Sequence, residues 1–165
     1  KKERPKTVIG LFPRHMHRID AWKKMLEDAG LPWVLRSEID NTVPFGHVVL
    51  WDVFGEMQSA FSLARAAFIG GSLAPVGGQN FLEPLTHGVT PVIGPYWSNF
   101  TWIGEEIFEK KLARQEQDWE GVLQGLLDIS KRAFKPEKVK KDFEKYLEDM
   151  RGGTVAACEA IKRNI

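Results

Sequence analysis

The residues best suited to chemistry lie together between Gly70 and Pro84, in the stretch GGSLAPVGGQNFLEP. The apolar run at residues 66–69 that precedes them is typical of a buried strand. Asn80 can cap a helix whose first turn holds Glu83. A strand, a glycine-rich loop and a helix N-terminus in this order bring bare backbone N–H groups to a point that an anion can approach closely. The stretch therefore predicts a phosphate-binding loop.

Glu83 has the wrong charge to bind phosphate, but a carboxylate offers two acceptors to a pair of sugar hydroxyls. Phosphate and ribose together indicate a nucleotide. The alternative is structural, because glycine pairs also make tight turns and Asn and Glu also serve only as helix caps. The spacing fits neither G-x-G-x-x-G nor G-x-x-x-x-G-K-[ST], which argues against a dinucleotide fold of the usual type and against a P-loop NTPase.

Length and composition predict one soluble domain covering residues 1–165. The chain is 43% hydrophobic and 27% charged, which is ordinary for a globular protein with one sizeable core. Its 23 basic and 22 acidic residues give a net charge of +1, so no global field favours nucleic acid. Cys158 is the single cysteine, and we expect it to pack in an apolar helix.

Strands and helices are predicted to alternate over the first two thirds of the chain. Apolar runs predict strands at residues 7–12, 32–35, 47–51, 66–69 and 90–93. Helical spacing is found at residues 19–26 and 55–64 and after Asn80. This order predicts an α/β fold, a Rossmann-like parallel sheet flanked by helices.

From about residue 118 only helical patterns remain, at residues 119–129, 136–150 and 154–163, with Gly152 and Gly153 breaking the last two. Six basic residues lie between Lys131 and Lys141. Because acidic residues are interspersed in the following helix, we interpret this segment as a solvated helix face rather than a binding patch.

Ligands of open parallel sheets bind beyond the carboxyl ends of the strands, and four loops are expected there. Pro13 and Arg14 follow the first strand, and a guanidinium held by a rigid proline could fork onto phosphate oxygens or be an ordinary surface group. Asp52 and Glu56 follow the third strand and could act as acid and base, although Glu56 is equally suited to cap a helix. His15 and His17, without a third ligand nearby, form only a weak metal motif.

The fourth loop, Gly94 to Phe100, reads GPYWSNF and begins an aromatic cluster that continues to Trp102. Aromatic side chains contribute much buried area, so core packing or domain contact is the favoured interpretation of this cluster.

Taken together, these motifs resemble the Kdo transferases of Gram-negative bacteria, which add 3-deoxy-D-manno-octulosonic acid (Kdo) from CMP-Kdo to lipid A precursors. The resemblance covers residues 7–110 clearly and the helical remainder loosely. It depends on Pro13-Arg14-His15, on Asp52 with Gly55-Glu56, on the glycine stretch and on GPYWSNF, in this order. The family has the GT-B arrangement of two Rossmann-like domains, and this chain resembles the C-terminal one alone.

The resemblance also implies roles for individual residues. Arg14 would contact the phosphate or the base, Gly77, Gly78 and Asn80 the phosphate region, and Glu83 the ribose, while the backbone near residues 51–55 would border the cytosine. Gln79 stands where the family usually has histidine, and it cannot carry a positive charge. The implied donor-binding residues are Pro13, Arg14, Asp52, Gly55, Gly77, Gly78, Gln79, Asn80 and Glu83.

The implied function is donor binding in an inverting, metal-independent glycosyltransferase of lipopolysaccharide biosynthesis, with no cofactor. The catalytic base, the acceptor contacts and the membrane anchor belong to the N-terminal half in this family. We therefore expect a soluble fragment that is inactive by itself, from an enzyme at the cytoplasmic face of the inner membrane.

Two alternatives remain. A GT-B transferase that uses a UDP-sugar would also need a glycine loop and a ribose-binding glutamate. A non-catalytic Rossmann-like module that binds a nucleotide or a partner protein would explain Gln79, because loss of a charged contact can accompany loss of catalysis.

Overall fold

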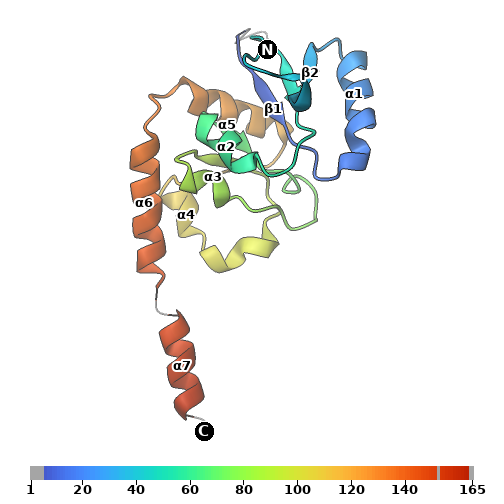
Figure 1. Ribbon diagram of the computed structural model, residues 1–165. Coiled ribbons are helices and arrows are strands. Elements are labelled where there is room, and N and C mark those ends of the chain that lie inside the picture. The colour runs from blue at the N-terminus through green and yellow to red at the C-terminus, as the bar shows by residue number, and fades with distance from the viewer. Residues whose placement is uncertain (1–5, 152, 164–165) are drawn as a thin grey trace. The chain divides into compact units, whose positions relative to one another are not determined.

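A computed structural model describes residues 6–151 and 153–163. The chain divides into two compact units, Lys1–Ala60 and Phe61–Ile165, and each is described here by itself. Helix α2 (Met57–Leu63) contains the boundary between them. Figure 1 labels the elements along the chain.

The first unit contains a three-stranded parallel sheet in the order β1-β3-β2. Its strands are β1 (Ile9–Leu11), β2 (Trp33–Leu35) and β3 (Val48–Leu50), and Ile9 and Trp33 both pair with Val48. The central strand is fully buried. Helix α1 (Ile19–Asp28) packs Ile19, Trp22 and Leu26 against this sheet, as the helical spacing predicted. Two 3₁₀ turns, η1 (Met16–Arg18) and η2 (Arg36–Glu38), follow β1 and β2.

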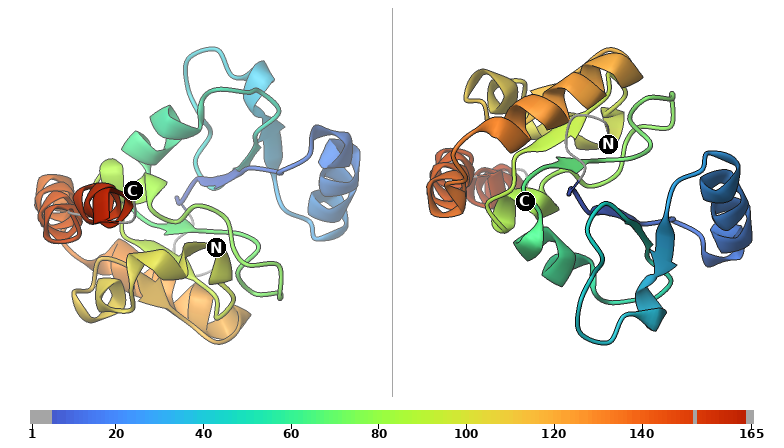
Figure 2. Two further views of the ribbon diagram at one scale, coloured as in Figure 1. Left: turned by 90° about the horizontal axis from the view of Figure 1, so that it is seen from below. Right: turned by 90° about the horizontal axis from the view of Figure 1, so that it is seen from above.

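The second unit contains another parallel sheet, in the order β4-β5-β6. Its strands are β4 (Ala67–Phe68), β5 (Pro91–Ile93) and β6 (Arg114–Gln115). Helix α5 (Trp119–Lys131) packs against β4 and β5 (Figure 2). The predicted strands at residues 66–69 and 90–93 are confirmed in shorter form. Strand β6 was not predicted, because two polar residues have no apolar run to reveal them.

The core of the second unit is built around the fully buried Phe81. Trp97 and Phe100 contact its ring edge to face, at centroid distances of 6.2 and 5.6 Å. Both belong to the aromatic cluster predicted to be core, and for them that interpretation is confirmed. Tyr96 and Trp102 differ, since 43% and 62% of their surfaces are exposed. The turn η3 (Ser98–Ile103) and the short helix α4 (Glu106–Glu109) complete this region.

The last third is helical, as predicted, with α5, α6 (Pro136–Asp149) and α7 (Gly153–Arg163). Helix α5 begins where Asp118 accepts a hydrogen bond from the Gly121 amide at 2.8 Å. The break predicted at Gly152 lies outside the described residues, and Gly153 begins α7. Cys158 on α7 is exposed, so the expectation that it packs in a core was wrong.

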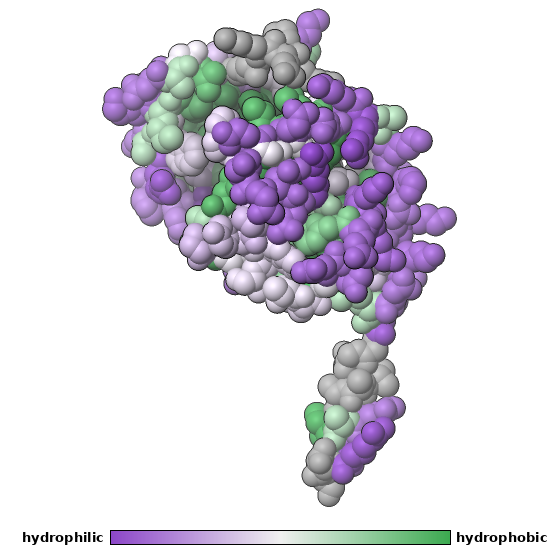
Figure 3. All heavy atoms as spheres, turned by 180° about the vertical axis from the view of Figure 1, so that it is seen from behind, coloured by the Kyte–Doolittle hydropathy of each residue, from purple (hydrophilic) through white to green (hydrophobic). Residues whose placement is uncertain are grey.

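Helix α6 confirms the solvated face expected for the basic segment. It buries Phe143 and Tyr146, while its charged side chains face outward (Figure 3). Lys138 pairs with Asp142, and Lys140 pairs with Glu137 at 3.1 Å. Among the described residues, no helix combines the length and hydrophobicity that crossing a bilayer requires.

Candidate functional site

The glycine loop leaves β4 and folds back on itself. Gly71, Gly77 and Gly78 have positive φ angles of 73°, 87° and 76°, which L side chains rarely adopt. The Gly78 amide donates to the Gly71 carbonyl at 3.0 Å, and the Gln79 amide donates to the Gly70 carbonyl at 3.1 Å. The two ends of the loop are therefore joined by their own backbone.

This pairing corrects the expectation that the loop offers all its amides to an anion. The N–H groups of Gly78 and Gln79 are satisfied by carbonyls of the same loop, because the left-handed glycines turn the chain back beside its start. Within residues 6–151 and 153–163, the amides of Gly77 and Asn80 make no hydrogen bond. Both amides can therefore donate to a ligand.

Ser72 fixes the loop to the neighbouring strand, a role that the sequence did not reveal. Its hydroxyl is buried, donates to the Ile69 carbonyl at 2.6 Å and accepts from the Gly94 amide at 2.9 Å. Its carbonyl also accepts from the Tyr96 amide at 3.0 Å. Ser72 thus joins the first turn of the glycine loop to the end of β5.

Asn99 fixes the second glycine pair. Its amide donates to the Gly77 carbonyl and its side-chain Nδ2 donates to the Gly78 carbonyl, both at 3.1 Å. A Cβ added at Gly77 would lie 2.6 Å from Asn99 Oδ1. The GPYWSNF segment thus contacts the glycine loop directly.

Asn80 and Glu83 lie side by side at the start of a very short helix. Asn80 Nδ2 donates to Glu83 Oε1 at 3.0 Å, and Asn80 Oδ1 accepts from the Leu82 amide at 3.0 Å. The helix, α3 (Glu83–Thr86), has Leu82 rather than Asn80 at its N-cap position, so the predicted cap was wrong. Asn80 instead forms an Asx turn, which keeps residues 80–82 out of the helix.

The first unit places Arg14 at the surface after β1. Arg14 is exposed, and its guanidinium makes no hydrogen bond or ion pair with any residue that the structure describes. Pro13 is half-buried beside it. The rings of His15 and His17 stack on each other at 5.5 Å. Arg14 therefore remains available to a ligand.

Asp52 and Glu56 both accept hydrogen bonds from residues that follow β2. Asp52 accepts from the Ser37 amide at 2.9 Å and from the Ser37 hydroxyl at 2.6 Å. Glu56 accepts from Arg36 at 2.8 and 3.0 Å and from the Trp51 indole at 3.1 Å. The arrangement does not suit an acid–base pair, because each carboxylate already has firm partners.

The hydrogen bonds of Asp52 also change its acidity. Partial burial raises the pKa of the Asp52 carboxyl, but the hydroxyl and amide of Ser37, helped by the charge of Lys23, outweigh burial and hold the pKa below its ordinary value. Such a group stabilises the fold above the ordinary carboxyl pKa and loses that contribution as pH falls through its folded-state pKa.

Replacing Ser37 with alanine removes the hydroxyl donor to Asp52 and keeps the amide donor. We expect the pKa of Asp52 to rise toward its ordinary value, and acidification to destabilise the variant less than it destabilises the native chain. A carbon-detected NMR titration of the Asp52 carboxyl measures the first effect and urea unfolding at several pH values the second. Thr42→Ala, at an exposed position of the same unit, is the control. An Asp52 pKa that stays at its native value in Ser37→Ala would contradict this account.

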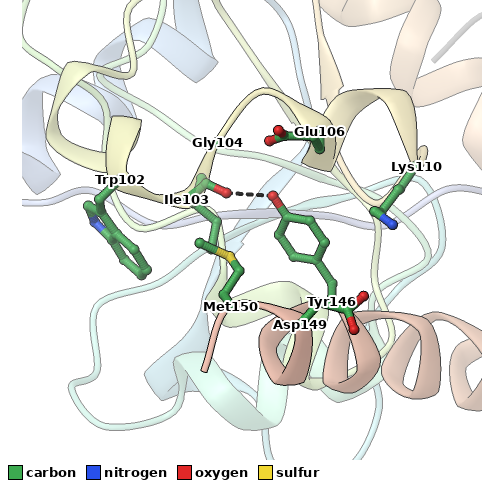
Figure 4. Close-up of a pocket in the computed structure, with 8 residues that line it drawn as sticks. All are labelled: Trp102, Ile103, Gly104, Glu106, Lys110, Tyr146, Asp149 and Met150. Carbon is green, nitrogen blue, oxygen red and sulfur yellow. Dashed lines mark hydrogen bonds between the residues drawn. The ribbon is translucent and has the colours of Figure 1, made fainter. Parts of the chain in front are cut away.

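A hollow of about 330 Å³ lies elsewhere in the second unit, among η3, α4 and α6 (Figure 4). Tyr146 donates its phenol proton to the Ile103 carbonyl there. Burial and the nearby Glu106 carboxylate raise the pKa of Tyr146, so the phenol stays protonated. None of the predicted donor-binding residues lines this hollow, which is formed by Trp102, Ile103, Gly104, Glu106, Lys110, Tyr146, Asp149 and Met150.

The structure thus gathers the predicted residues into two sets, one in each unit. Pro13, Arg14, Asp52 and Gly55 belong to the first unit, and the second holds Gly77, Gly78, Gln79, Asn80 and Glu83. Parallel strands alternating with helices, and a glycine-rich loop after β4, define a Rossmann-like α/β protein.

Comparison with known proteins agrees with this class. No protein-family model matches the chain. A bifunctional glycosyltransferase/methyltransferase of Fusobacterium nucleatum is 29% identical over 139 residues, which is 83% of this chain and 22% of that protein. A 3-deoxy-D-manno-octulosonic acid transferase of Bordetella pertussis is 38% identical over 97 residues, or 58% of this chain and 23% of that protein.

A solved structure also matches, the C-terminal CMP-Kdo binding domain of WaaA from Acinetobacter baumannii. The TM-score is 0.75 at 30% identity, and the match covers 85% of this chain and 73% of that domain. The chain belongs to the 3-deoxy-D-manno-octulosonic acid transferase family and corresponds to the C-terminal domain of its members. This confirms the fold class, the C-terminal half of a GT-B glycosyltransferase. The chain spans less than a quarter of the length of the two curated relatives above.

Proposed function

We propose that this chain is the donor-binding domain of a glycosyltransferase that transfers Kdo from CMP-Kdo to a lipid A precursor in lipopolysaccharide biosynthesis. The observation that carries the proposal is the match to a solved domain that is named for CMP-Kdo binding, at 30% identity over 73% of that domain. The local geometry of each unit supports it independently.

In the second unit, the groups that remain available suit the phosphate and ribose of a nucleotide. The amides of Gly77 and Asn80, which have no hydrogen-bond acceptor among the described residues, can donate to phosphate oxygens. The half-buried Glu83 is oriented by Asn80 and can accept hydrogen bonds from ribose hydroxyls. Gln79 is exposed and can contribute a neutral hydrogen bond where a histidine would add charge.

In the first unit, Arg14 is exposed, and its guanidinium makes no hydrogen bond or ion pair with any residue that the structure describes. A guanidinium of this kind can contact the donor phosphate, as the resemblance implies for this residue, and stabilise negative charge that grows there. In the proposed reaction, an acceptor hydroxyl forms a bond to the anomeric carbon of Kdo while the bond from that carbon to the phosphate oxygen of CMP breaks. The hydroxyl proton passes to a base that the N-terminal half of the enzyme supplies. The same half would hold the lipid acceptor and the membrane anchor, at the cytoplasmic face of the inner membrane.

Calorimetric titration of the chain with CMP, UMP, UDP and ADP tests donor binding. We expect CMP to bind more tightly than the other three nucleotides. Preference for a uridine nucleotide would support a UDP-sugar transferase instead. Absence of binding by all four would support a non-catalytic module and contradict the proposal.

A transfer assay with CMP-Kdo and a lipid A precursor tests whether this chain binds the donor without transferring Kdo. Because the proposed base and acceptor contacts belong to the other half of the enzyme, the 165 residues alone should bind donor without transferring Kdo. Measurable turnover by this chain would contradict that assignment.

A further inference from the structure

The second glycine pair of the loop is held by hydrogen bonds on two sides. On one side, the amides of Gly78 and Gln79 donate to carbonyls at the start of the loop, at 3.0 and 3.1 Å. On the other side, the carbonyls of Gly77 and Gly78 accept from the backbone amide and the side-chain Nδ2 of Asn99. The two peptide groups that join residues 77 to 79 are therefore each bonded through both N–H and C=O.

These bonds restrict a part of the backbone that would otherwise turn easily. Glycine adopts positive and negative φ almost equally well, so peptide groups next to glycines rotate at little cost. Rotation of the Gly78–Gln79 peptide group would break two hydrogen bonds, one of them to Asn99. Successive N–H groups attract an anion and a carbonyl oxygen repels it, so the directions of these peptide groups decide whether the loop suits a phosphate.

Asn99 is itself held by the aromatic core of the second unit. It lies in η3, and the neighbouring rings of Trp97 and Phe100 both contact the buried Phe81. Phe81 directly follows Asn80 in the sequence, so the same buried ring also attaches the end of the glycine loop. Asn99 and the loop are thus fixed to one group in the core.

The side-chain amide of Asn99 packs directly against Gly77. A Cβ added at Gly77 would lie 2.6 Å from Oδ1 of Asn99 and 2.7 Å from its Cγ and Nδ2. Only a glycine leaves room for this contact. The Asn99 side chain therefore contacts the backbone of Gly77 while it donates to the carbonyl of Gly78.

We propose that Asn99 is a positioning residue for the phosphate of the donor nucleotide. The inference rests on the proposed function, in which the amides of Gly77 and Asn80 donate to that phosphate. These two amides flank the two fixed peptide groups, so Asn99 helps to set the direction of one donor relative to the other. Donors that are oriented before the ligand arrives cost little to reorganise on binding. All of these groups belong to the second unit.

The test compares CMP with cytidine, which has the same base and ribose without the phosphate. Ligand-observed NMR titration measures both affinities, even where they are weak. Asn99→Ala removes the Nδ2 donor to Gly78 and keeps the backbone donor to Gly77. We expect it to weaken CMP binding about threefold to tenfold, the effect of one net hydrogen bond on an equilibrium, and to leave cytidine binding unchanged.

Amide hydrogen exchange separates a positioning role from direct contact with the phosphate. In Asn99→Ala the Gly78 carbonyl loses its side-chain partner, so the Gly78–Gln79 peptide group can turn away from Gly70. The Gln79 amide should therefore exchange faster by a similar factor, while the Gly78 amide changes less. Weaker CMP binding with unchanged exchange at Gln79 would mean that Asn99 contacts the phosphate itself, and would overturn the positioning role.

Asn99→Asp keeps the shape of the side chain and replaces its donor with a charged acceptor. Because a carboxylate repels both the Gly78 carbonyl and a phosphate, this variant should lose more affinity for CMP than Asn99→Ala and none for cytidine. Ser98→Ala is the matched control, since Ser98 is exposed in the same turn and its hydroxyl has no hydrogen-bond partner among the described residues. It should change neither affinity nor the exchange at Gln79.

Three results would contradict the inference while nucleotide binding stands. Asn99→Ala could bind CMP as tightly as the native chain, it could lose CMP and cytidine equally, or the native chain could bind CMP and cytidine equally. The second result would mean that Asn99 supports the fold only, and the third that the loop does not hold the phosphate. If the native chain binds no CMP, the proposed function is wrong and this inference with it.

Discussion

Gly94→Ala is expected to destabilise the second unit by about 3 kcal/mol, the upper end of the usual cost of overpacking. A Cβ at this position would lie 2.1 Å from the Ser72 carbonyl oxygen and 2.5 Å from its carbon. These are backbone atoms at the point where the glycine loop meets β5, so no side-chain rotation relieves the clash. Moving Ser72 would also break its hydrogen bonds to Gly94 and Ile69. Urea unfolding followed by near-UV circular dichroism of the aromatic core measures the loss.

Gly70→Ala is the matched control in the same loop. A Cβ there would have only Gln79 Nε2 within reach, at 4.0 Å, and no positive φ is required. We expect its stability to stay within about 0.5 kcal/mol of the native chain, as for substitutions that create neither clash nor strain. If Gly94→Ala were as stable as Gly70→Ala, the conclusion that Gly94 packs tightly against the Ser72 backbone would be contradicted.

The sequence predicted local structure best where a short pattern of residues has one common structural cause. Glycine pairs are typical of tight turns, the structural alternative for this loop, and Gly71, Gly77 and Gly78 adopt the positive φ angles of such turns. Apolar runs predicted the parallel strands, and Val48–Leu50 and Pro91–Ile93 are fully buried. Both signals are local, so they can be interpreted without knowing the contacts that form later.

Contacts over long distances in the sequence could not be predicted in the same way. Ser72 is one serine in a loop, and only its position beside Gly94 makes its hydroxyl structural. Arg36 has no motif of its own, yet it binds Glu56 twenty residues away. Searching for polar residues next to motif glycines could have suggested Ser72, but nothing in the sequence indicated Arg36.

The prediction that the backbone N–H groups of the glycine loop have no hydrogen-bond partner was wrong for two of them, for a reason that applies to any glycine-rich loop. Positive φ angles bring N–H groups to the surface of a turn, but they also let these groups donate to carbonyls of the same turn. Here Gly78 and Gln79 pair with Gly71 and Gly70, which leaves fewer donors for an anion. The residues proposed to bind the donor nucleotide came from the family resemblance. The local geometry of each unit shows which of their hydrogen-bonding groups are still available to a ligand.

Glu83→Ala is expected to remove discrimination between CMP and 2′-deoxy-CMP. In the proposed site, the carboxylate accepts from ribose hydroxyls, and hydrogen bonds to charged groups contribute about 1.5–3 kcal/mol each. The native chain should therefore bind CMP about tenfold to a hundredfold more tightly than 2′-deoxy-CMP. The variant should bind the two ligands almost equally, through loss of affinity for CMP. NMR or calorimetric titration of CMP and 2′-deoxy-CMP against the native chain and Glu83→Ala gives the coupling free energy between Glu83 and the ribose 2′-hydroxyl.

Asn80→Ala should give an intermediate result, because the carboxylate of Glu83 remains but loses the amide that orients it at 3.0 Å. Glu109→Ala, which changes an exposed carboxylate at the end of α4, should leave both affinities unchanged. Equal loss of both ligands in Glu83→Ala would mean that Glu83 supports the loop and does not bind ribose. Retention of the full preference for CMP would remove Glu83 from the donor site, and the two outcomes differ in the affinity for 2′-deoxy-CMP.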